Sequence, residues 1–469
     1  MSINPAAPRL QVSTTNRQIT AHAGAILVRE TAAAVGLSTA VDQNLHLKKR
    51  RRGLSESQAV SGMAEAVAMG AECLDDLAVA GADQVQLKLR GHQVINPKTA
   101  GVFLRRFTLG HIRQFDRALQ AVHRRAFDLL EPVETLTLDF DSSYVKSYSS
   151  RRQGADPTYL KRYALHPLFC FVSGLDICLN AKLRKGSSHT ARGIDQFIDQ
   201  SLNRTPAGVR IRARFDSGFY SERLLAHLQK RGVTFLCGVP LNARIKEQIA
   251  LVGEDCWHPC LDKDEGEVAE FGYRMASSKV FRRYIVKRIE RRPGEQLDLE
   301  TGRYNYWVCV TSDHQADPTT LESEHRHKAQ VEGGIRELKQ NLGLHVWRKH
   351  RFYANWAWLL IVVTAHNLLR WTELLGQLGS RLRAKRLRYR YLNVAGLLVS
   401  SGRRTILKLS AAYPLQTTSP KPWSPSGRWP HHPAKSTRNP CSRLSESSLG
   451  PAQAACNYPT TIQLTTNWL

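Results

Sequence analysis

The segment VETLTLDFD, residues 133–141, decides the fold because its apolar and polar residues alternate. A period of two predicts a β-strand with two different faces. The leucine and phenylalanine side chains share one face, and Asp139 and Asp141 share the other. Burying two carboxylates without a cation nearby is unfavourable. We therefore expect the acidic face of this strand to meet positive charge.

Further strand-like segments follow the first one along the chain. Residues 168–172 and 177–183 predict two strands that turn at Gly174, and 209–216 and 233–239 predict two more. Helices are expected at 194–202 and from Ser221-Glu222 onward. Three strands, a helix, a strand, a helix and a strand predict a mixed sheet covered by helices. The predicted fold class is α/β.

The N-terminal region has helical rather than strand-like patterning. Ser55-Glu-Ser57 precedes a helix rich in Ala, Val and Met, and Asn96-Pro97 opens another. Two short helices in a basic region suggest a helix-turn-helix-like DNA-binding module, with Arg105 and Arg106 projecting from the second helix. Surface arginines on an ordinary helix fit the same pattern equally well.

The sequence divides into segments that differ in charge and in predicted secondary structure. Between 241 and 306 the chain is rich in charge, with strand-like pieces at 267–275 and 281–289 that predict a β-rich insertion. A long polar helix is expected from Thr319 to Leu342, followed by a buried helix over 356–371. The predicted organisation is a flexible arm (1–25), a helical DNA-binding region (26–130), a catalytic core (131–240 and 307–375) interrupted by the insertion (241–306), a basic C-terminal region (376–422) and a disordered tail (423–469).

The charge of the chain points to an acidic partner. Its 469 residues include 67 Lys and Arg against 40 Asp and Glu, a formal net charge of +27. Such an imbalance predicts nucleic acid or an anionic membrane as partner. The most apolar run, 356–369, is too short to span a bilayer and contains His366 and Asn367. Nucleic acid is therefore favoured, and no membrane association is expected.

One basic run lies just before the first well-marked helix. Five adjacent cations could contact phosphates or form a solvated linker, and the sequence leaves both interpretations open. They are Lys48, Lys49, Arg50, Arg51 and Arg52.

The nine cysteines follow no repeating framework, which is typical of reduced thiols in a cytoplasmic protein. The one local cluster is Cys256-Trp-His258-Pro-Cys260. Zinc would need a second pair of ligands at a suitable spacing, so no zinc site is expected here.

Three carboxylates on separate elements carry the predicted chemistry. Asp141 ends the first strand, Asp216 ends a later one, and Glu332 lies on the polar helix. Each alone has an ordinary structural explanation, but the set suits hard, oxygen-seeking cations such as Mg²⁺. Two such ions can activate an attacking water or 3′-hydroxyl and stabilise the departing oxygen of a phosphodiester. No Ser or Tyr nucleophile is then required.

These residues resemble a known family. Asp-Phe-Asp141-Ser-Ser, Arg-Phe-Asp216-Ser-Gly-Phe-Tyr, and Glu332 followed by Lys339 are similar to the DDE transposases of bacterial insertion sequences. More narrowly, they resemble the IS4-like group with a Tyr-Arg-Glu-Lys signature and, within it, insertion-sequence family thirteen-eighty. Supporting phrases are Leu165-His-Pro-Leu168, Leu183-Arg-Lys-Gly186, Ile335-Arg-Glu-Leu-Lys339 and Asn355-Trp-Ala-Trp-Leu359, so the resemblance covers about residues 25 to 410.

The resemblance implies a ribonuclease H-like core with a β insertion between Asp216 and Glu332. It also implies Mg²⁺ as the cofactor, with Mn²⁺ as a substitute, and cut-and-paste chemistry on double-stranded DNA. The partners implied are terminal inverted repeats and target DNA, bound by a homodimer in the synaptic complex. The location implied is the bacterial cytoplasm, in association with the nucleoid.

The signature departs from the family at two places. The positions of its Tyr, Arg, Glu and Lys hold His325, Lys328, Glu332 and Lys339. The spacing keeps the first three on one helical face. Lys in place of Arg retains a phosphate-binding charge but loses the bidentate fork. A DNA-contacting role is expected for His325, Lys328 and Lys339, and a catalytically inactive DNA-binding copy stays open as an alternative.

Two assignments within this scheme stay open. Asp139 and Asp141 share a face of the strand. Asp141 is favoured as the first metal ligand, because the family usually has Asp followed by Ser or Thr at this strand. Asp139 is then either a supporting partner or an additional metal ligand. The insertion offers Trp257 as the first choice for stacking on an extruded base. An aromatic in the small core of the insertion explains Trp257 as well.

Three rival functions fit part of the sequence. A DNA-binding regulator without catalysis would use the basic helical region alone, and the three carboxylates would then have no function. A tyrosine recombinase needs an arginine–histidine cluster, and His325-Arg-His327 resembles one. Asp141 and Asp216 would then have no role. A ribonuclease H-like nuclease without strand transfer shares every feature of the predicted core.

Overall fold

The computed structural model describes most of the chain up to residue 410. The described residues are 13–48, 52–158, 161–261, 266–292, 294, 302–345, 347, 349–379, 381–402 and 404–410. By its internal contacts the chain divides into two units, Met1–Pro430 and His431–Leu469, and all described residues belong to the first. The predicted disordered tail and three members of the first basic run, Lys49, Arg50 and Arg51, lie outside the described residues.

A nine-stranded sheet organises the first unit, in the order β10-β11-β12-β13-β9-β8-β2-β6-β7. Strand β2 (Thr135–Ser142) pairs antiparallel with β6 (Leu168–Val172), which pairs antiparallel with β7 (Ile177–Lys182). On its other side, β2 pairs parallel with β8 (Arg210–Phe215), and β8 pairs parallel with β9 (Thr234–Val239). The predicted mixed sheet is confirmed, with strand ends that differ by at most two residues.

The helices that connect the parallel strands also follow the prediction. Helix α8 (Ile194–Leu202) precedes β8, and α9 (Glu222–Lys230) carries the chain from β8 to β9. The hydroxyl of Ser221 accepts a hydrogen bond from the backbone N–H of Leu224 at the start of α9. This N-cap satisfies one of the free N–H groups of the first helical turn.

The predicted insertion is joined to the central sheet rather than folded apart from it. Strands β11 (Gly266–Tyr273), β12 (Arg282–Glu290) and β13 (Tyr304–Thr311) form an antiparallel ribbon, with β10 (His258–Pro259) at its edge and α10 (Ala243–Ala250) before it. Residues 308–311 of β13 pair antiparallel with β9. The boundary drawn at 306 from the sequence therefore falls inside a strand that bridges the ribbon and the core.

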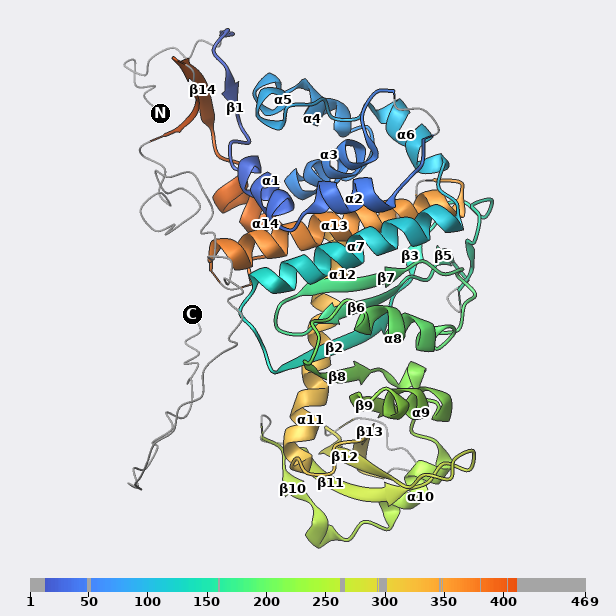
Figure 1. Ribbon diagram of the computed structural model, residues 1–469. Helices are drawn as coiled ribbons and strands as arrows, with labels where there is room; N and C mark the ends of the chain where they lie inside the picture. The colour runs from blue at the N-terminus through green and yellow to red at the C-terminus, as the bar shows by residue number, and fades with distance from the viewer. Residues whose placement is uncertain are drawn as a thin grey trace, which may run out of the picture. The chain divides into compact units, whose positions relative to one another are not determined.

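A group of helices precedes β2 and lies on one side of the sheet (Figure 1). These helices are α1 (Ala25–Ala34), α2 (Leu37–Asn44), α3 (Glu56–Met69), α4 (Leu77–Ala82), α5 (Gln84–Arg90), α6 (Pro97–Arg105) and α7 (Leu109–Leu129). Both predicted helix starts are confirmed: Ser55 and Gln58 form a capping box at α3, and Asn96 caps α6. Figure 1 shows α7 and α13 between the smaller helices and the sheet.

Segments near the two ends of the described chain pair with each other. Strands β1 (Ile19–Thr20), β14 (Gly396–Ser401) and β15 (Arg404–Leu409) form a separate three-stranded sheet. The predicted flexible arm thus contains a strand, because the backbone of Ile19 pairs with that of Leu397. A third sheet consists of the short strands β3 (Val145–Lys146), β5 (Tyr163–Leu165) and β4 (Asp156–Pro157).

The predicted buried helix is confirmed as α13 (Phe352–Gly376). A helix of this length and composition could also cross a membrane, but 83% of its most apolar stretch is buried within the protein, as in a core helix. Its Asn367 side chain accepts a hydrogen bond from the backbone N–H of Cys178 and donates one to the backbone oxygen of the same residue. Asn367 therefore satisfies polar backbone groups on the edge strand β7.

The long polar helix predicted from 319 to 342 is interrupted in the middle. Helix α11 (Pro318–Arg326) passes through a 3₁₀ turn (His327–Ala329) into α12 (Gln330–Asn341). A 3₁₀ turn within a helix often accompanies strain or a functional hinge. Here the turn contains Lys328, whose side chain is buried. Beyond α13, the chain forms α14 (Ala384–Leu387) and a π-helical turn (Arg388–Leu392).

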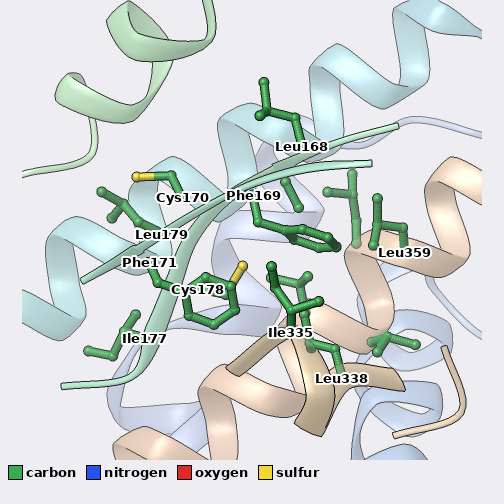
Figure 2. Close-up of a cluster of buried hydrophobic side chains, with 14 of the residues drawn as sticks. Leu168, Phe169, Cys170, Phe171, Ile177, Cys178, Leu179, Ile335, Leu338 and Leu359 are labelled. Atoms are coloured by element: carbon green, nitrogen blue, oxygen red, sulfur yellow. The ribbon is translucent and has the colours of Figure 1, made fainter. Parts of the chain in front are cut away.

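Close packing against the β6–β7 hairpin fixes the position of α12. Figure 2 shows Phe169 and Phe171 of the hairpin in one cluster with Ile335 and Leu338 of α12. Gly334 makes this approach possible, because a Cβ atom at that position would lie 2.6 Å from the ring of Phe171. The core thus determines where the first turn of α12 meets the sheet.

Two adjacent glycines in α12 should respond to alanine in opposite directions. Gly333→Ala meets no atom within 4 Å and should raise the free energy of unfolding by about 0.5–1 kcal/mol, because alanine favours the helix. Gly334→Ala should lower it by about 1–3 kcal/mol, because the new methyl group collides with Phe171. Urea unfolding of both variants measures this difference, and equal effects would show that α12 does not pack as described.

Candidate active site

The ends of β2 and β8 present two matching tripeptides, Asp139-Phe-Asp141 and Arg214-Phe-Asp216. The two strands are parallel, with Asp139 in register with Arg214. Side chains two residues further along each strand point to the same face. Continuing this register by two residues places Asp141 opposite Asp216.

The first pair of these tripeptides forms a buried salt bridge. Arg214 Nε lies 2.6 Å from one carboxylate oxygen of Asp139, and its Nη2 lies 2.9 Å from the other. Arg214 Nη2 also donates to Ser173 Oγ at 2.7 Å, and Nη1 donates to the backbone oxygen of Glu324 in α11. Burial raises the pKa of Asp139, and the guanidinium of Arg214 opposes that rise. Both oxygens of Asp139 are engaged by Arg214, which fits the supporting role that the sequence left open for it.

The second pair of the tripeptides stacks in the apolar layer beneath. The rings of Phe140 and Phe215 lie 4.7 Å apart at an angle of 10°. Both side chains are fully buried. This contact holds the two strand ends together on the face opposite the carboxylates.

The third pair, with Glu332, forms the candidate catalytic set. Glu332 lies exposed in the first turn of α12, and Asp216 is exposed at the end of β8. Burial is the main cause that raises the pKa of Asp141 to about 6; the charges of Asp216 and Glu332 also raise it, while Lys328 lowers it. Asp141 therefore lies within electrostatic range of both other carboxylates.

The three carboxylates lie near one another but do not converge on one point as the ligands of a bound metal ion would. Within the described ranges, no three His, Cys, Asp or Glu side chains stand close enough to hold a metal ion as they are. Like charges repel in a partly buried site, which favours such spacing when no cation joins them. Three carboxylates whose charges raise the pKa of Asp141 nevertheless make a donor set that suits Mg²⁺.

A lysine ammonium supplies positive charge between these acids. Lys328 Nζ lies 2.8 Å from Asp216 Oδ1, and the Lys328 side chain is only 7% exposed. Its charge also lowers the pKa of Asp141. The 3₁₀ turn therefore places a positive charge beside Asp216 and close enough to Asp141 to lower its pKa.

The other two signature residues lie at the same strand ends. Lys339 Nζ donates to Ser143 Oγ at 2.6 Å and to the backbone oxygen of Tyr144 at 2.9 Å, directly after β2. Burial lowers the pKa of Lys339, and the nearby charge of Asp141 opposes that shift. His325 Nε2 lies 3.4 Å from the backbone oxygen of Phe215, and burial lowers its pKa to about 4, so the imidazole is neutral at pH 7.

Supporting residues around Asp141 were not assigned a role from the sequence. His166 Nε2 lies 2.9 Å from Ser142 Oγ, and the His166 ring stacks on Tyr144 at 4.0 Å. Arg184 Nε donates to the backbone oxygen of His166 at 3.0 Å. The phrases around His166 and Arg184 thus brace the loop that follows Asp141. The signal for them in the sequence is the pair of phrases around His166 and Arg184 that support the family resemblance, which did not assign either residue a role.

The aromatic residue chosen from the sequence for base stacking is covered. Trp257 is 8% exposed, and the Arg288 guanidinium lies 4.1 Å from its ring centre. Tyr306 packs beside it. The burial of Trp257 fits the alternative interpretation from the sequence, an aromatic in the small core of the ribbon.

A different tryptophan faces the strand ends. Trp307 of β13 is 54% exposed and lines a hollow of about 460 Å³. Asp216 and His325 line the same hollow. Trp307 was not predicted from the sequence, because nothing in the local pattern distinguishes it from Trp257.

The remaining candidate residues lie away from the carboxylates. Lys48, Arg52, Arg105 and Arg106 line one groove among the N-terminal helices. In the Cys256–Cys260 cluster, Cys256 is exposed and Cys260 is buried, and no metal-binding group occurs there within the described residues.

Comparison with known proteins adds one clear match. The family model described as "Transposase DDE domain group 1" matches residues 5–421 of this chain. No curated protein matches the chain. Among solved structures, a piggyBac transposase in its synaptic complex with hairpin DNA, determined by cryo-EM, is 13% identical, with 80% of this chain and 82% of that chain covered and a TM-score of 0.43.

The two neighbouring aspartates of β2 should differ in what they contribute to stability. Asp139→Ala leaves the buried charge of Arg214 unpaired and should lower the free energy of unfolding by about 3–5 kcal/mol. Asp141→Asn removes a carboxylate whose ionised form is disfavoured by burial, so stability should stay unchanged or rise. Urea unfolding in the presence of EDTA measures both. The reverse order would assign the structural role to Asp141.

Proposed function

Because this chain belongs to the family described as Transposase DDE domain group 1, we propose that it cuts DNA strands at the ends of an insertion sequence and joins them to target DNA. The observation that carries this proposal is the coupling of three carboxylates. The charges of Asp216 and Glu332 raise the pKa of Asp141, although the three residues come from the ends of two strands and from a helix. A structural role alone gives no reason to gather three acids around a single lysine, Lys328.

Asp141, Asp216 and Glu332 would hold divalent metal ions, with Mg²⁺ as the natural cofactor and Mn²⁺ as a substitute. DDE transposases generally use divalent metals, and carboxylate oxygens are the ligands that Mg²⁺ prefers. When bound, two such ions activate the attacking oxygen and stabilise the leaving oxygen of a phosphodiester.

The basic signature residues bind and orient the DNA backbone in this proposal. Lys328, which pairs with Asp216 in this structure, would pair its ammonium with a phosphate oxygen of bound DNA. Lys339, held by Ser143 and Tyr144, presents a second positive charge beside Asp141. The neutral imidazole of His325 donates to the backbone of β8 and keeps α11 against the strand end.

The finer placement of the protein is also a proposal. Strand β2 has an antiparallel hairpin on one side and two parallel strands on the other, and this order supports the proposal of a ribonuclease H-like core. The shared location of His325, Lys328 and Lys339 supports membership of the IS4-like group and of family thirteen-eighty. The substrates would be terminal inverted repeats and target DNA, bound by a homodimer at the bacterial nucleoid, with residues 26–130 as the DNA-binding region.

One observation favours a second function, DNA binding without catalysis. The ammonium of Lys328 occupies an oxygen of Asp216 that a metal ion would need. If lysine holds that position more strongly than metal does, the protein binds DNA but does not cut it. Metal-dependent nicking of DNA separates the two functions.

The first prediction from this proposal concerns the three carboxylates. Alanine at Asp141, Asp216 or Glu332 should reduce strand cleavage roughly 10³-fold or more, and double variants should be little worse than single ones, because the ligands act as a unit. The assay is nicking of a supercoiled plasmid that carries the DNA flanking the gene, with Mg²⁺ or Mn²⁺. Ca²⁺ should support binding without cleavage.

Binding of the same DNA is the control for these variants. It should survive each substitution, because phosphate contacts elsewhere supply the affinity. Full cleavage by Asp216→Ala or Glu332→Ala protein would overturn the assignment, and wild-type protein that binds but never nicks would support the second function.

The second prediction concerns the two tryptophans. An extruded base is steadied by stacking on an exposed aromatic ring, so Trp307→Ala should slow end processing while DNA binding and folding persist. Trp257→Ala is the matched control, and it should lower the yield of folded protein by removing a buried ring. Gel analysis of cleaved ends, beside thermal unfolding, measures both. Normal end processing in Trp307→Ala would exclude the stacking role.

A further inference from the structure

An arginine of the basic C-terminal region is used inside the fold. Arg388 begins the π-helical turn after α14, and its Nε and Nη2 donate to the backbone oxygens of Ala68 and Val67 at 2.7 and 2.8 Å. Its Nη1 donates to the backbone oxygen of Asn341 at 3.0 Å. These carbonyls belong to the last turns of α3 and α12, where a helix leaves backbone oxygens without a partner. One guanidinium therefore joins the ends of two helices.

A buried glutamate makes a second contact between α12 and the same C-terminal segment. Glu337 is 4% exposed, and its Oε1 accepts a hydrogen bond from the backbone N–H of Ala384, the first residue of α14. Arg370 of α13 lies near the same oxygen, with its Nη2 at 4.0 Å. Helix α12 is thus attached to the chain that follows α13 at two places, once in its middle and once at its end.

The segment just before α14 is itself anchored on α13. Glu373 Oε1 accepts a hydrogen bond from the backbone N–H of Leu382, and Arg370 Nη2 donates to the backbone oxygen of the same residue. Arg370 Nη1 and Glu373 Oε2 form a buried salt bridge at 2.8 Å. Because breaking a buried pair leaves an uncompensated charge, residues 382–384 give α12 a firm support. We call residues 382–388 the α12 clamp.

The position of α12 determines where Glu332 lies. Glu332 precedes Glu337 by five residues, which places the two side chains about 140° apart around the helix. Glu337 can therefore contact the clamp while Glu332 stays within electrostatic range of Asp141. The 3₁₀ turn His327–Ala329 interrupts the helix just before Glu332, so α11 does not fix the direction of α12. Packing at Gly334 sets how closely α12 approaches the sheet, and the clamp sets its direction and rotation.

We propose that Glu337 and Arg388 are positioning residues, which hold the metal ligand Glu332 in place through the α12 clamp. This inference rests on the proposed transposase function, in which Glu332 binds a divalent metal ion. Glu337 and Arg388 touch neither metal nor DNA and act through the backbone of α12. Buried ion pairs are often no more stabilising than apolar packing, which favours a role in geometry. The basic C-terminal region thus contributes to the core, alongside exposed cations such as Lys385 and Arg386.

The first test measures metal affinity in the full chain without DNA, by electron paramagnetic resonance of free Mn²⁺. Glu337→Leu leaves the N–H of Ala384 without its acceptor and should weaken Mn²⁺ binding about 10–100-fold, as the loss of a partner behind a metal ligand does. Glu337→Gln keeps an acceptor oxygen and should restore most of the affinity. Unchanged affinity in Glu337→Leu protein would overturn the proposal.

A double variant shows whether Glu337 acts through Glu332. In protein that already carries Glu332→Ala, Glu337→Leu should cause no further loss of Mn²⁺ affinity, because the carboxylate that it positions is absent. A further loss of the same size as in the single variant would show that Glu337 acts elsewhere, and it would contradict the proposal.

A matched pair of arginines separates positioning from general stabilisation. Arg388→Ala removes three hydrogen bonds, and Arg282→Ala in β12 also removes three, two to Glu222 and one to Ser278. Both variants should lower the midpoint of urea unfolding. Only Arg388→Ala should weaken Mn²⁺ binding and speed hydrogen–deuterium exchange of the backbone amides of α12. Similar effects of the two variants on α12 and on Mn²⁺ would reduce Arg388 to a stabilising residue.

A further variant covers the case in which Glu337→Leu protein does not fold. Ala384→Pro removes the N–H that Glu337 binds, and proline is favoured at the first position of a helix. The preceding residue, Arg383, already has the extended backbone that proline requires before it. This variant should speed exchange in α12 and weaken Mn²⁺ binding as Glu337→Leu does, and slow exchange with normal Mn²⁺ binding would count against the clamp.

Failure of the clamp and failure of the transposase function give different results. Hydrogen exchange in α12 needs neither metal nor DNA. If Arg388→Ala and Ala384→Pro loosen α12 while wild-type protein never nicks DNA, the clamp stands and the transposase proposal fails. If wild-type protein nicks DNA, but these variants neither loosen α12 nor raise the Mg²⁺ concentration for half-maximal nicking, the function stands and the clamp fails.

Discussion

The salt bridge between Asp139 and Arg214 is the constraint on which the rest of the candidate site depends. It forms between residues in register on two parallel strands, and a third nitrogen of the guanidinium reaches the backbone of α11. One buried arginine therefore aligns β2 with β8 and attaches the helix that leads to Glu332. Because removing either partner of a buried pair leaves an uncompensated charge, this alignment is stiff. Asp141 and Asp216, two residues further along each strand, acquire their relative position from it.

The site combines this rigid base with carboxylates that repel one another. The pKa of Asp141 is raised by burial and by two neighbouring acids, and Lys328 provides the compensating charge within the protein. A site of this kind gains stability when cations bind, since repulsion is exchanged for attraction. Packing supplies further control: Gly334 lets α12 approach Phe171 closely, so the position of Glu332 also depends on a glycine and an aromatic ring.

The sequence predicted the parts of the fold that follow from local periodicity. The five strands from β9 to β7, the helices between them and the caps at Ser55 and Asn96 were all evident from residue patterns. It did not predict that β13 joins the ribbon to the core, because pairing with β9 is a long-range contact that no local pattern encodes. The break in the polar helix at Lys328 was not predicted for a similar reason. Lys328 pairs with Asp216, which lies more than a hundred residues away in the sequence. Asp139 and Asp141 were equivalent by periodicity, and only the partner strand distinguishes the paired acid from the free one. Trp257 and Trp307 differ only in burial.

The most direct test of the account is to locate the bound metal. Iron(II) in place of magnesium generates hydroxyl radicals that cut a polypeptide close to the ion, so the protein bound to its flanking DNA can be treated with iron and ascorbate and its fragments mapped. If Asp141, Asp216 and Glu332 hold the metal together, cuts should cluster near all three positions and should disappear when excess Mg²⁺ is added. Cuts confined to other segments, or cuts near only one of the three that Mg²⁺ does not suppress, would contradict the central claim.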